Sequence, residues 1–442
     1  MNAKLKKNNQ LKKINPYAGG IDVGSEKIFV SVPDQPVKNF DTYTASLIKC
    51  SRYLKENKVE TVAMEATGVY WIPIYEILEA AGIEVCLVNG SHVKNVPGRK
   101  SDVQDCQWLH ELHSYGLLRS SFIPEEGIRC LRSYVRLRDD HIQMAASHVL
   151  HMQKAMDLMN IKLHNVISQV TGKSGLRIIN AILNGVRDAE KLVELCDTQI
   201  LNKKKEQVIL SLQGNYKQEH LFALKQALNC WDFYNQQILD CDHQIEEVLN
   251  KMTENKQTPL NIKAPKLIRH HKPEVNNLHL KLMKLTDGKD ASQIAGFTDL
   301  SLLQIISEVG LDVSKWLTSK HFTSWLGLSP GMHQSGKRRK KRSSKAKPKA
   351  GQIFRLAAQS VGKSKHLALG GFHRRIKSRH GAKIATKATA RKIAVLYYNT
   401  MKHGIEYVEE GLKMYDEKYR ERQIKYITKK AQELGLELKM AS

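Results

Sequence analysis

Mostly apolar side chains recur every three or four residues between Leu131 and Leu163, and this seam constrains the fold more than any other feature of the sequence. Such heptad spacing is typical of a long helix whose apolar edge packs against a second helix. A similar helical pattern returns over residues 207–252. We therefore expect an antiparallel coiled-coil arm, with a plain long core helix as the simpler alternative. The seam consists of Leu131, Val135, Arg138, Ile142, Ala145, Val149, Met152, Met156, Met159 and Leu163.

Residues 17–125 carry a different pattern, in which short apolar runs of strand type are interleaved with helical ones. Three strand runs come first, and helices then alternate with further strands. This order predicts a mixed α/β sheet with helices on its faces. Strands are expected at 18–23, 27–32, 39–43, 60–66 and 84–88, and helices at 45–56, 69–80 and 101–115.

Charge is distributed very unevenly along the chain. The 442 residues carry a formal net charge of +26, and the window from Val313 to Ile405 holds 23 Lys or Arg with no Asp or Glu. A field this one-sided repels itself in the folded state unless a polyanion occupies it. We therefore expect DNA, RNA or both as a partner; a solvated basic face without a partner is the alternative.

The composition disfavours several other classes of protein. No apolar run approaches the roughly 18 residues of a membrane helix, and the lysine-rich residues 1–16 are typical of a disordered basic arm rather than a signal peptide. The seven cysteines are scattered and form no CxxC pair. This disfavours a disulfide framework or a zinc knuckle and favours a reducing compartment. We expect no membrane association and a cytoplasmic location.

Four carboxylates stand out by their positions. Asp22 lies inside an apolar strand in GIDVGS, and Glu65 ends another predicted strand in MEATG. Asp102 and Asp105 are three residues apart near the start of a helix, so they share one face of it. A charge inside a strand is costly to bury unless it is paired or binds a cation. Convergence of the four at one edge of the sheet would suit Mg²⁺, and two such ions can stabilise a phosphodiester displacement.

Each acid also has an ordinary structural explanation when it is considered alone. Asp102 lies in a first helical turn, where the helix dipole favours acids, Asp105 could be a surface residue, and Glu65 could cap a loop. Asp22 is the hardest to explain in this way. His110 and His113 follow on the same helix, but their spacing is not that of HExxH. We expect these histidines to form a helix face rather than to bind metal.

The order GIDVGS, MEATGVYW and KSDVQDCQWL resembles the N-terminal domain of the DEDD-type insertion-sequence transposases of the IS one-ten family. The resemblance covers most of the chain by motif order, and residues 165–290 look longer than in compact members. It implies catalytic, Mg²⁺-binding roles for Asp22, Glu65, Asp102 and Asp105. The expected fold is an α/β ribonuclease H-like (RuvC-like) N-terminal domain, a helical coiled-coil arm and a mainly α-helical C-terminal domain. The expected boundaries are 1–16 for the basic arm, 17–128 for the catalytic domain, 129–252 for the coiled-coil arm, 253–290 for a linker, 291–405 for the basic domain and 406–442 for a C-terminal helix.

The segment LGLSPGMHQSGKRRKKR resembles the C-terminal motif of the same family, in which a serine-glycine pair precedes basic residues. The residue that matches the family's nucleophile is Ser335. A serine needs a base or metal to deprotonate it and cations to stabilise the phosphate charge; His333 is the one local base, so a metal is the better candidate. Without the resemblance Ser335 would be an ordinary turn residue. Nucleic-acid contacts are expected from Lys337, Arg338, Arg339, Lys340, Lys341, Arg342, Arg374, Arg375, Lys377 and Arg379.

The leading hypothesis is a DNA transposase or recombinase that cleaves and rejoins strands through Ser335, with Mg²⁺ at the four acids. The resemblance further implies an element-encoded, structured non-coding guide RNA and a prokaryotic, nucleoid-associated location. It also implies a homo-oligomer, a dimer or tetramer, in which the acids of one protomer work with the serine of another. The main alternative is a RuvC-like structure-selective nuclease with water as nucleophile. An actin-like sugar kinase, suggested by GIDVGS, and an inactive nucleic-acid-binding protein are weaker alternatives.

Overall fold

The computed structural model describes residues 12–90, 101–260, 262–330, 332–335, 338–341 and 348–436. The chain divides into two compact units, Met1–Ile123 and Pro124–Ser442. This division falls a few residues before the expected end of the N-terminal domain at residue 128. None of the helices in the described ranges combines the length and the apolar character that crossing a membrane requires.

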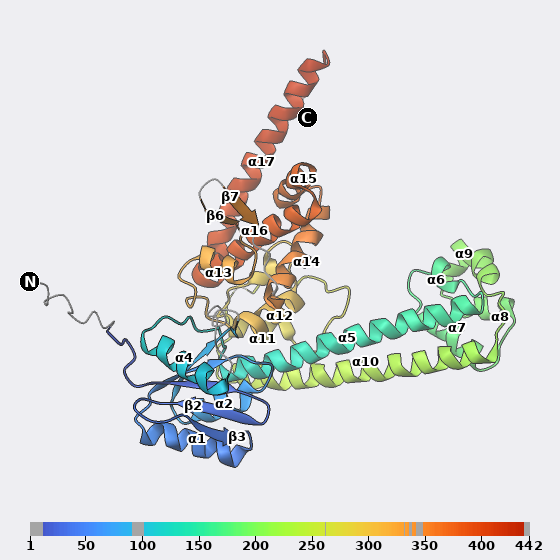
Figure 1. Ribbon diagram of the computed structural model, residues 1–442. Helices are drawn as coiled ribbons and strands as arrows, with labels where there is room; N and C mark the ends of the chain where they lie inside the picture. The colour runs from blue at the N-terminus through green and yellow to red at the C-terminus, as the bar shows by residue number, and fades with distance from the viewer. Residues whose placement is uncertain are drawn as a thin grey trace, which may run out of the picture. The chain divides into compact units, whose positions relative to one another are not determined.

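The first unit is built on a five-stranded sheet in the order β3-β2-β1-β4-β5 (Figure 1). β1 is antiparallel to β2 and β2 to β3, whereas β1, β4 and β5 are parallel neighbours. The predicted mixed sheet is therefore confirmed. The elements are β1 Ala18–Val23, β2 Lys27–Ser31, β3 Lys38–Asp41, α1 Thr44–Glu56, β4 Thr61–Glu65, α2 Trp71–Ala80, β5 Glu84–Val88 and α4 Asp102–Ser114.

The two faces of this sheet are covered differently. The larger core lies under α1 and α2, where Leu54 and Ile74 pack with Ile21 and Met64 of the central strands. On the other face a smaller cluster joins Ala63 and Val88 to Leu109 of α4. Side chains alternate between faces along a strand. Residues next to the core positions in β1 and β4 therefore point toward the side of α4.

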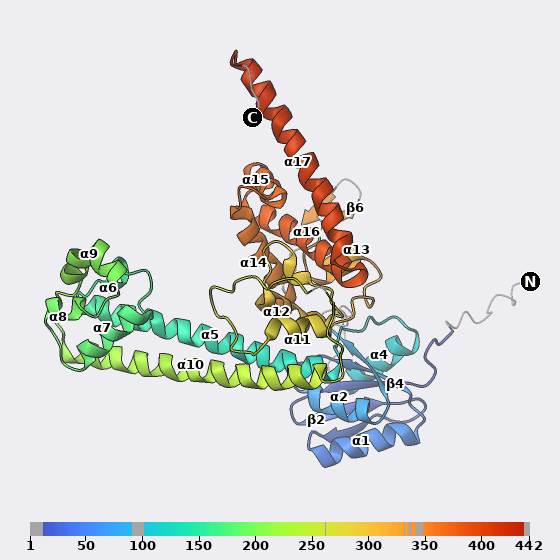
Figure 2. The ribbon, with the colours of Figure 1, turned by 180° about the vertical axis from the view of Figure 1, so that it is seen from behind.

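The second unit begins with two long antiparallel helices, α5 Glu126–Leu158 and α10 Gln218–Thr253, which lie side by side (Figures 1 and 2). Gly127 lies against Met252 at one end, and the ring of His148 stacks on Tyr234 further along. The predicted seam faces the partner helix, and Arg138 forms a buried ion pair with Asp242 in it. The partner helix begins at Gln218, later than the helical pattern at residue 207 suggests.

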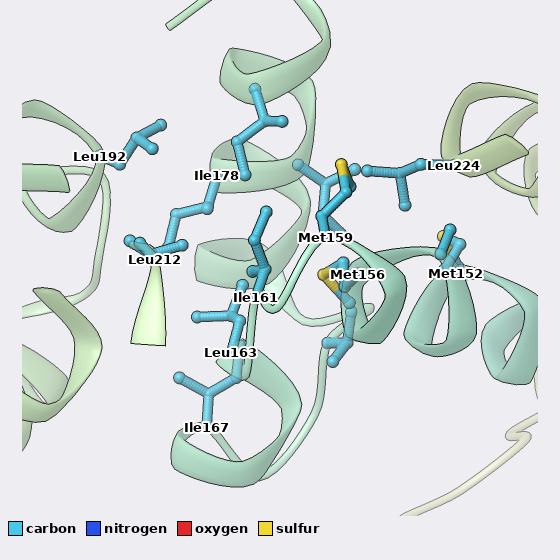
Figure 3. Packing of buried hydrophobic residues seen from close by; sticks show 14 of the residues in the cluster. Met152, Met156, Met159, Ile161, Leu163, Ile167, Ile178, Leu192, Leu212 and Leu224 are labelled. Carbon is cyan, nitrogen blue, oxygen red and sulfur yellow. The ribbon is translucent and has the colours of Figure 1, made fainter. Parts of the chain in front are cut away.

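Between these helices the chain forms a small helical cap with its own core. The cap consists of α6 Leu163–Val166, α7 Lys173–Leu183, α8 Ala189–Val193 and α9 Thr198–Ser211. Figure 3 shows its packing around the end of α5, where the apolar seam continues past the last helical turn. The buried residues labelled there are Met152, Met156, Met159, Ile161, Leu163, Ile167, Ile178, Leu192, Leu212 and Leu224.

The remaining helices form the C-terminal body. Its core is aromatic: Phe322 stacks with Tyr397 and meets Trp316 and Phe354 edge to face. The segment expected as a linker contains α11, and Nζ of Lys266 donates to the carbonyl of Ser292 at 2.8 Å. The elements are α11 Leu278–Leu285, η1 Ala291–Gln293, α12 Asp299–Val309, α13 Ser319–Trp325, β6 Met332–Ser335, β7 Arg338–Lys341, α14 Lys349–Lys363, α15 Ala368–His380, α16 Ala382–His403 and α17 Ile405–Glu433.

Candidate active site

Two of the predicted acids lie on neighbouring parallel strands at the same level of the sheet. Ile21 of β1 is in register with Met64 of β4, and Asp22 and Glu65 each follow by one residue. Because parallel neighbours in register point to the same face, the side chains of Asp22 and Glu65 leave the sheet together. Ile21 and Met64 belong to the core beneath α1 and α2, so both carboxylates project on the side of α4.

Helix α4 approaches the sheet very closely, and a glycine makes this possible. A Cβ atom on Gly20 of β1 would lie 2.2 Å from the carbonyl oxygen of Cys106 and 2.4 Å from the amide nitrogen of His110. Any side chain at Gly20 would therefore push the helix away. The first turn of α4 carries Asp102 and Asp105, and the hydroxyl of Ser101 caps it by accepting from the Gln104 amide at 3.4 Å.

The histidines of α4 fasten the helix to the strands. Nδ1 of His110 is 3.0 Å from the hydroxyl of Ser31 on β2, and Nε2 of His113 is 2.9 Å from the hydroxyl of Thr61 on β4. Burial is the largest cause that lowers the pKa of His110 to about 4, and burial also lowers the pKa of His113. Both imidazoles are therefore neutral hydrogen-bonding groups, as expected for a helix face.

The four predicted acids meet electrostatically at this edge of the sheet. The pKa of Asp22 is raised to about 6, first by burial and then by the charges of Asp102, Asp105 and Glu65. Glu65 is confined as well, because a Cβ on Gly90 would lie 2.1 Å from its Oε1 atom. The carboxylates thus form one negative cluster. The described residues contain no group of three or more His, Cys, Asp or Glu already arranged as a ligand set.

The predicted serine lies in the other compact unit, on a short hairpin. β6 and β7 are antiparallel, and their backbone register places Ser335 opposite Arg338 and His333 opposite Lys340. The serine is thus the last residue of its strand before the turn. Two of the expected nucleic-acid contacts, Lys337 and Arg342, lie outside the described residues. Of the expected basic set, Arg339, Lys340 and Lys341 share β7 with Arg338.

The other expected nucleic-acid contacts lie on α15, where Arg374, Arg375, Lys377 and Arg379 are all exposed. The guanidinium of Arg374 donates to the carbonyl of Ser364. Arg375 lies over the ring of Phe372 at 5.9 Å, and Nζ of Lys392 lies over the same ring at 4.7 Å. Burial, and then Arg375, lowers the pKa of Lys392. This face of the body gathers cations close together, which suits a polyanion.

Sequence reasoning missed the features that hold α4 in place. Gly20 stands directly before the acid-bearing end of β1, and a glycine within a strand can signal a close backbone approach. The sequence alone gives no indication of which element approaches. The partners Ser31 and Thr61 are ordinary strand residues, and only the fold shows that they receive the histidines of α4.

Models of known protein families match both the acid-bearing region and the basic helical body of this chain. A family model described as a transposase, DEDD type of IS110, matches residues 19–161. A second model, described as transposase IS116/IS110/IS902 family, matches residues 289–369. Among curated proteins, none matches the chain significantly. The acid-bearing mixed sheet and the basic helical body are therefore parts of a DNA transposase. The chain belongs to the IS110 family of DEDD transposases.

Proposed function

We propose that the N-terminal unit is a ribonuclease H-like (RuvC-like) catalytic domain in which Asp22, Glu65, Asp102 and Asp105 hold Mg²⁺. The sheet order, with two antiparallel strands beside three parallel ones, supports this fold. The observation that carries the proposal is the placement of Asp22 and Glu65 on paired strands beneath α4, whose first turn carries two further acids. Burial first, and then the other three carboxylates, raises the pKa of Asp22 there. Because the carboxylates repel one another, four negative charges are unfavourable in this cluster, and the binding of a divalent cation is favourable.

The donor set fits Mg²⁺, which prefers carboxylate oxygens and needs only one or two of them together with water and substrate phosphate. Bound there, Mg²⁺ would stabilise negative charge on phosphate oxygens and favour deprotonation of an attacking hydroxyl. Asp22 and Glu65 offer their oxygens from paired strands, and Asp102 and Asp105 from a helix fixed by two histidine hydrogen bonds. The side chains are therefore held by rigid elements, which reduces the reorganisation that the reaction requires.

We propose that Ser335 is the nucleophile of strand cleavage. Its Oγ forms a bond to the phosphorus of the scissile phosphodiester while the bond to one deoxyribose oxygen breaks. The serine proton leaves to a base, and the released deoxyribose oxygen takes up a proton. A second DNA hydroxyl then attacks the phosphoserine and restores Ser335, so the number of phosphodiester bonds is conserved. The cations of β7, the strand that pairs with the strand of Ser335, would supply charge stabilisation.

We further propose the partners that such a reaction needs. The acid-free window from residue 313 to 405 supports binding of DNA at the element ends and target, together with a structured guide RNA. The acids and Ser335 belong to different compact units. That separation is compatible with a homo-oligomer, a dimer or tetramer, in which one protomer's acids act with the serine of another.

Trapping of the covalent intermediate tests this function. Wild-type protein with Mg²⁺ and labelled element-end DNA should form a protein–DNA adduct that survives denaturing gel electrophoresis. Ser335→Ala should abolish both the adduct and cleavage, because no other group supplies the attacking oxygen. Ser329→Ala, a serine in the turn before the hairpin, should leave both intact and serves as the matched control.

A structure-selective nuclease that uses water is the second candidate. It is favoured by one observation, namely that the acid cluster is complete within the first unit without the serine. In that case Ser335→Ala would cut DNA at the wild-type rate, and wild-type protein would form no adduct. Asp22→Asn should abolish cleavage under both mechanisms, so it confirms that cutting depends on the acid site but does not choose between them.

A further inference from the structure

The segment that bears Ser335 leaves and re-enters the helical body at one place, which we call the hairpin base and define as Leu326, Gly327 and Pro348. Gly327 ends α13 in a left-handed turn, with φ of 66°. A Cβ atom on Gly327 would lie 3.4 Å from Cδ of Pro348, and one on Gly351 of α14 only 2.2 Å from the Leu326 carbonyl oxygen. Helices α13 and α14 therefore hold the two ends of the hairpin segment together.

Arg355 stands at the hairpin base, one helical turn beyond Gly351. Its Nη2 atom donates to the carbonyl oxygen of Gly327 at 3.4 Å, and its Nη1 atom to Oε1 of Gln352 at 3.3 Å. Both acceptors are neutral, so these two hydrogen bonds do not compensate the positive charge. By contrast, Lys349 at the start of the same helix pairs with Asp139 at 3.5 Å.

A second cation lies on α16, the helix that packs against α14. Lys387 is partly buried, and its pKa is lowered first by this burial and then by the charge of Arg355. Burial also lowers the pKa of Arg355. Within the described ranges no carboxylate pairs with either residue. Like charges held together in partly desolvated surroundings are unfavourable by themselves, and an anion between them would relieve the repulsion.

We infer that Arg355 and Lys387 form a phosphate-binding site at the hairpin base, for the DNA strand that Ser335 cleaves. The inference rests on the proposed function, because that function brings a DNA strand to this hairpin. The planar guanidinium can donate two hydrogen bonds to one phosphate, and the ammonium adds a point charge beside it. Such a contact would position the strand without reading its sequence. DNA is favoured over RNA because the site lies at the base of the segment that carries the nucleophile.

Equilibrium binding tests the site separately from catalysis. Arg355→Gln and Lys387→Gln each remove one charge, and Lys363→Gln removes one from the exposed end of α14 as the matched control. Fluorescence anisotropy in EDTA would measure affinity for a labelled DNA duplex, a DNA single strand and an RNA single strand of the same sequence. We expect each site variant to weaken DNA binding about tenfold, the double variant little more, and the salt slope to fall by about 1. The control should change affinity less than about twofold.

Equal losses in the site variants and in Lys363→Gln would mean a diffuse basic surface and would overturn the inference. A loss confined to the RNA strand would do the same, because the site would then serve RNA. Lys387 donates no hydrogen bond to the residues that the structure describes, so Lys387→Gln decides the outcome even if Arg355→Gln fails to fold. If wild-type protein bound no nucleic acid at all, the proposed function itself would fail; equal effects of site and control variants would contradict only the phosphate site.

Discussion

Asp22 shows most clearly how a single residue connects fold and function. Its neighbours Ile21 and Val23 are buried in the core, yet its own side chain projects beside other carboxylates. Burial first, and then the charges of these carboxylates, raises its pKa to about 6. A group whose charged form is disfavoured in the native state weakens that state wherever it is ionised. The acid site is therefore expected to reduce the stability of the metal-free protein at neutral pH.

The pH dependence of stability follows from this shift. An unfolded aspartate titrates near 3.8 and folded Asp22 near 6, so between these values the folded metal-free protein binds the extra proton. Its stability should then fall as the pH rises through this window and stay lower above it. Asp22→Asn should remove this loss of stability. In EDTA at about pH 7.5 its Tm should be higher than that of the wild type, and its Tm should change less than that of the wild type between about pH 5 and pH 7.5.

Thermal melts of the wild type and Asp22→Asn at both pH values give the measurement. Asp41→Asn, which alters an exposed carboxyl on β3, is the control and should melt like the wild type at each pH. If the Tm of the wild type and that of Asp22→Asn changed by the same amount between the two pH values, the raised pKa of Asp22 would be contradicted.

At the scale of elements, the sequence predicted the mixed sheet and the paired helices well because both depend on repeating patterns. The heptad seam from Leu131 to Leu163 is largely buried, and the strand at 84–88 has the predicted bounds. The sequence places residues 163–217 in the helical arm but does not predict the cap that they form, since its short helices have no regular period and pack around the end of α5. In the site, the acids were predictable from their places on strands and helix, whereas the support of α4 by Gly20, Ser31 and Thr61 was not.

Arg138 is the polar member of the apolar seam and joins three segments. Its Nε atom donates to Oδ1 of Asp242 at 2.5 Å, and its Nη2 atom to the carbonyl of His271 at 3.1 Å. Oδ2 of Asp242 in turn accepts from the amide of Glu274 at 3.0 Å. A single buried ion pair of this kind can fix the register of two helices, since shifting either helix would leave both charges unpaired.

Replacement of this pair should reveal its role in the arm. Arg138→Met should lower the free energy of unfolding by about 3–5 kcal/mol, because it leaves the buried Asp242 without a counter-charge. The double variant Arg138→Met, Asp242→Leu should lose much less, since two apolar side chains can fill the space. Urea unfolding followed by circular dichroism measures both. A single variant as stable as the wild type would show that the pair does not hold the helices in register.

At the scale of the whole molecule, the candidate site of the first unit is negatively charged, whereas the candidate nucleic-acid surface of the second unit is positively charged. The first gathers four carboxylates at one sheet edge, and the second presents cations on α14, α15 and α16 without an acid between residues 313 and 405. Membership of the IS110 family agrees with this division, because one model matches residues 19–161, from β1 through α5, and the other matches residues 289–369 in the basic C-terminal body. Under the proposed function, one unit therefore binds the metal cation and the other binds phosphate.

The binding of Mg²⁺ by the carboxylate cluster is the central claim, and a titration of Tm against Mg²⁺ at neutral pH tests it most directly. A ligand that binds only the folded state raises Tm with concentration. The account predicts that Mg²⁺ raises the Tm of the wild type and of Asp41→Asn, and has no such effect on Asp22→Asn or Glu65→Gln. An equal rise in Asp22→Asn and the wild type would show that Mg²⁺ binds elsewhere and would contradict the account.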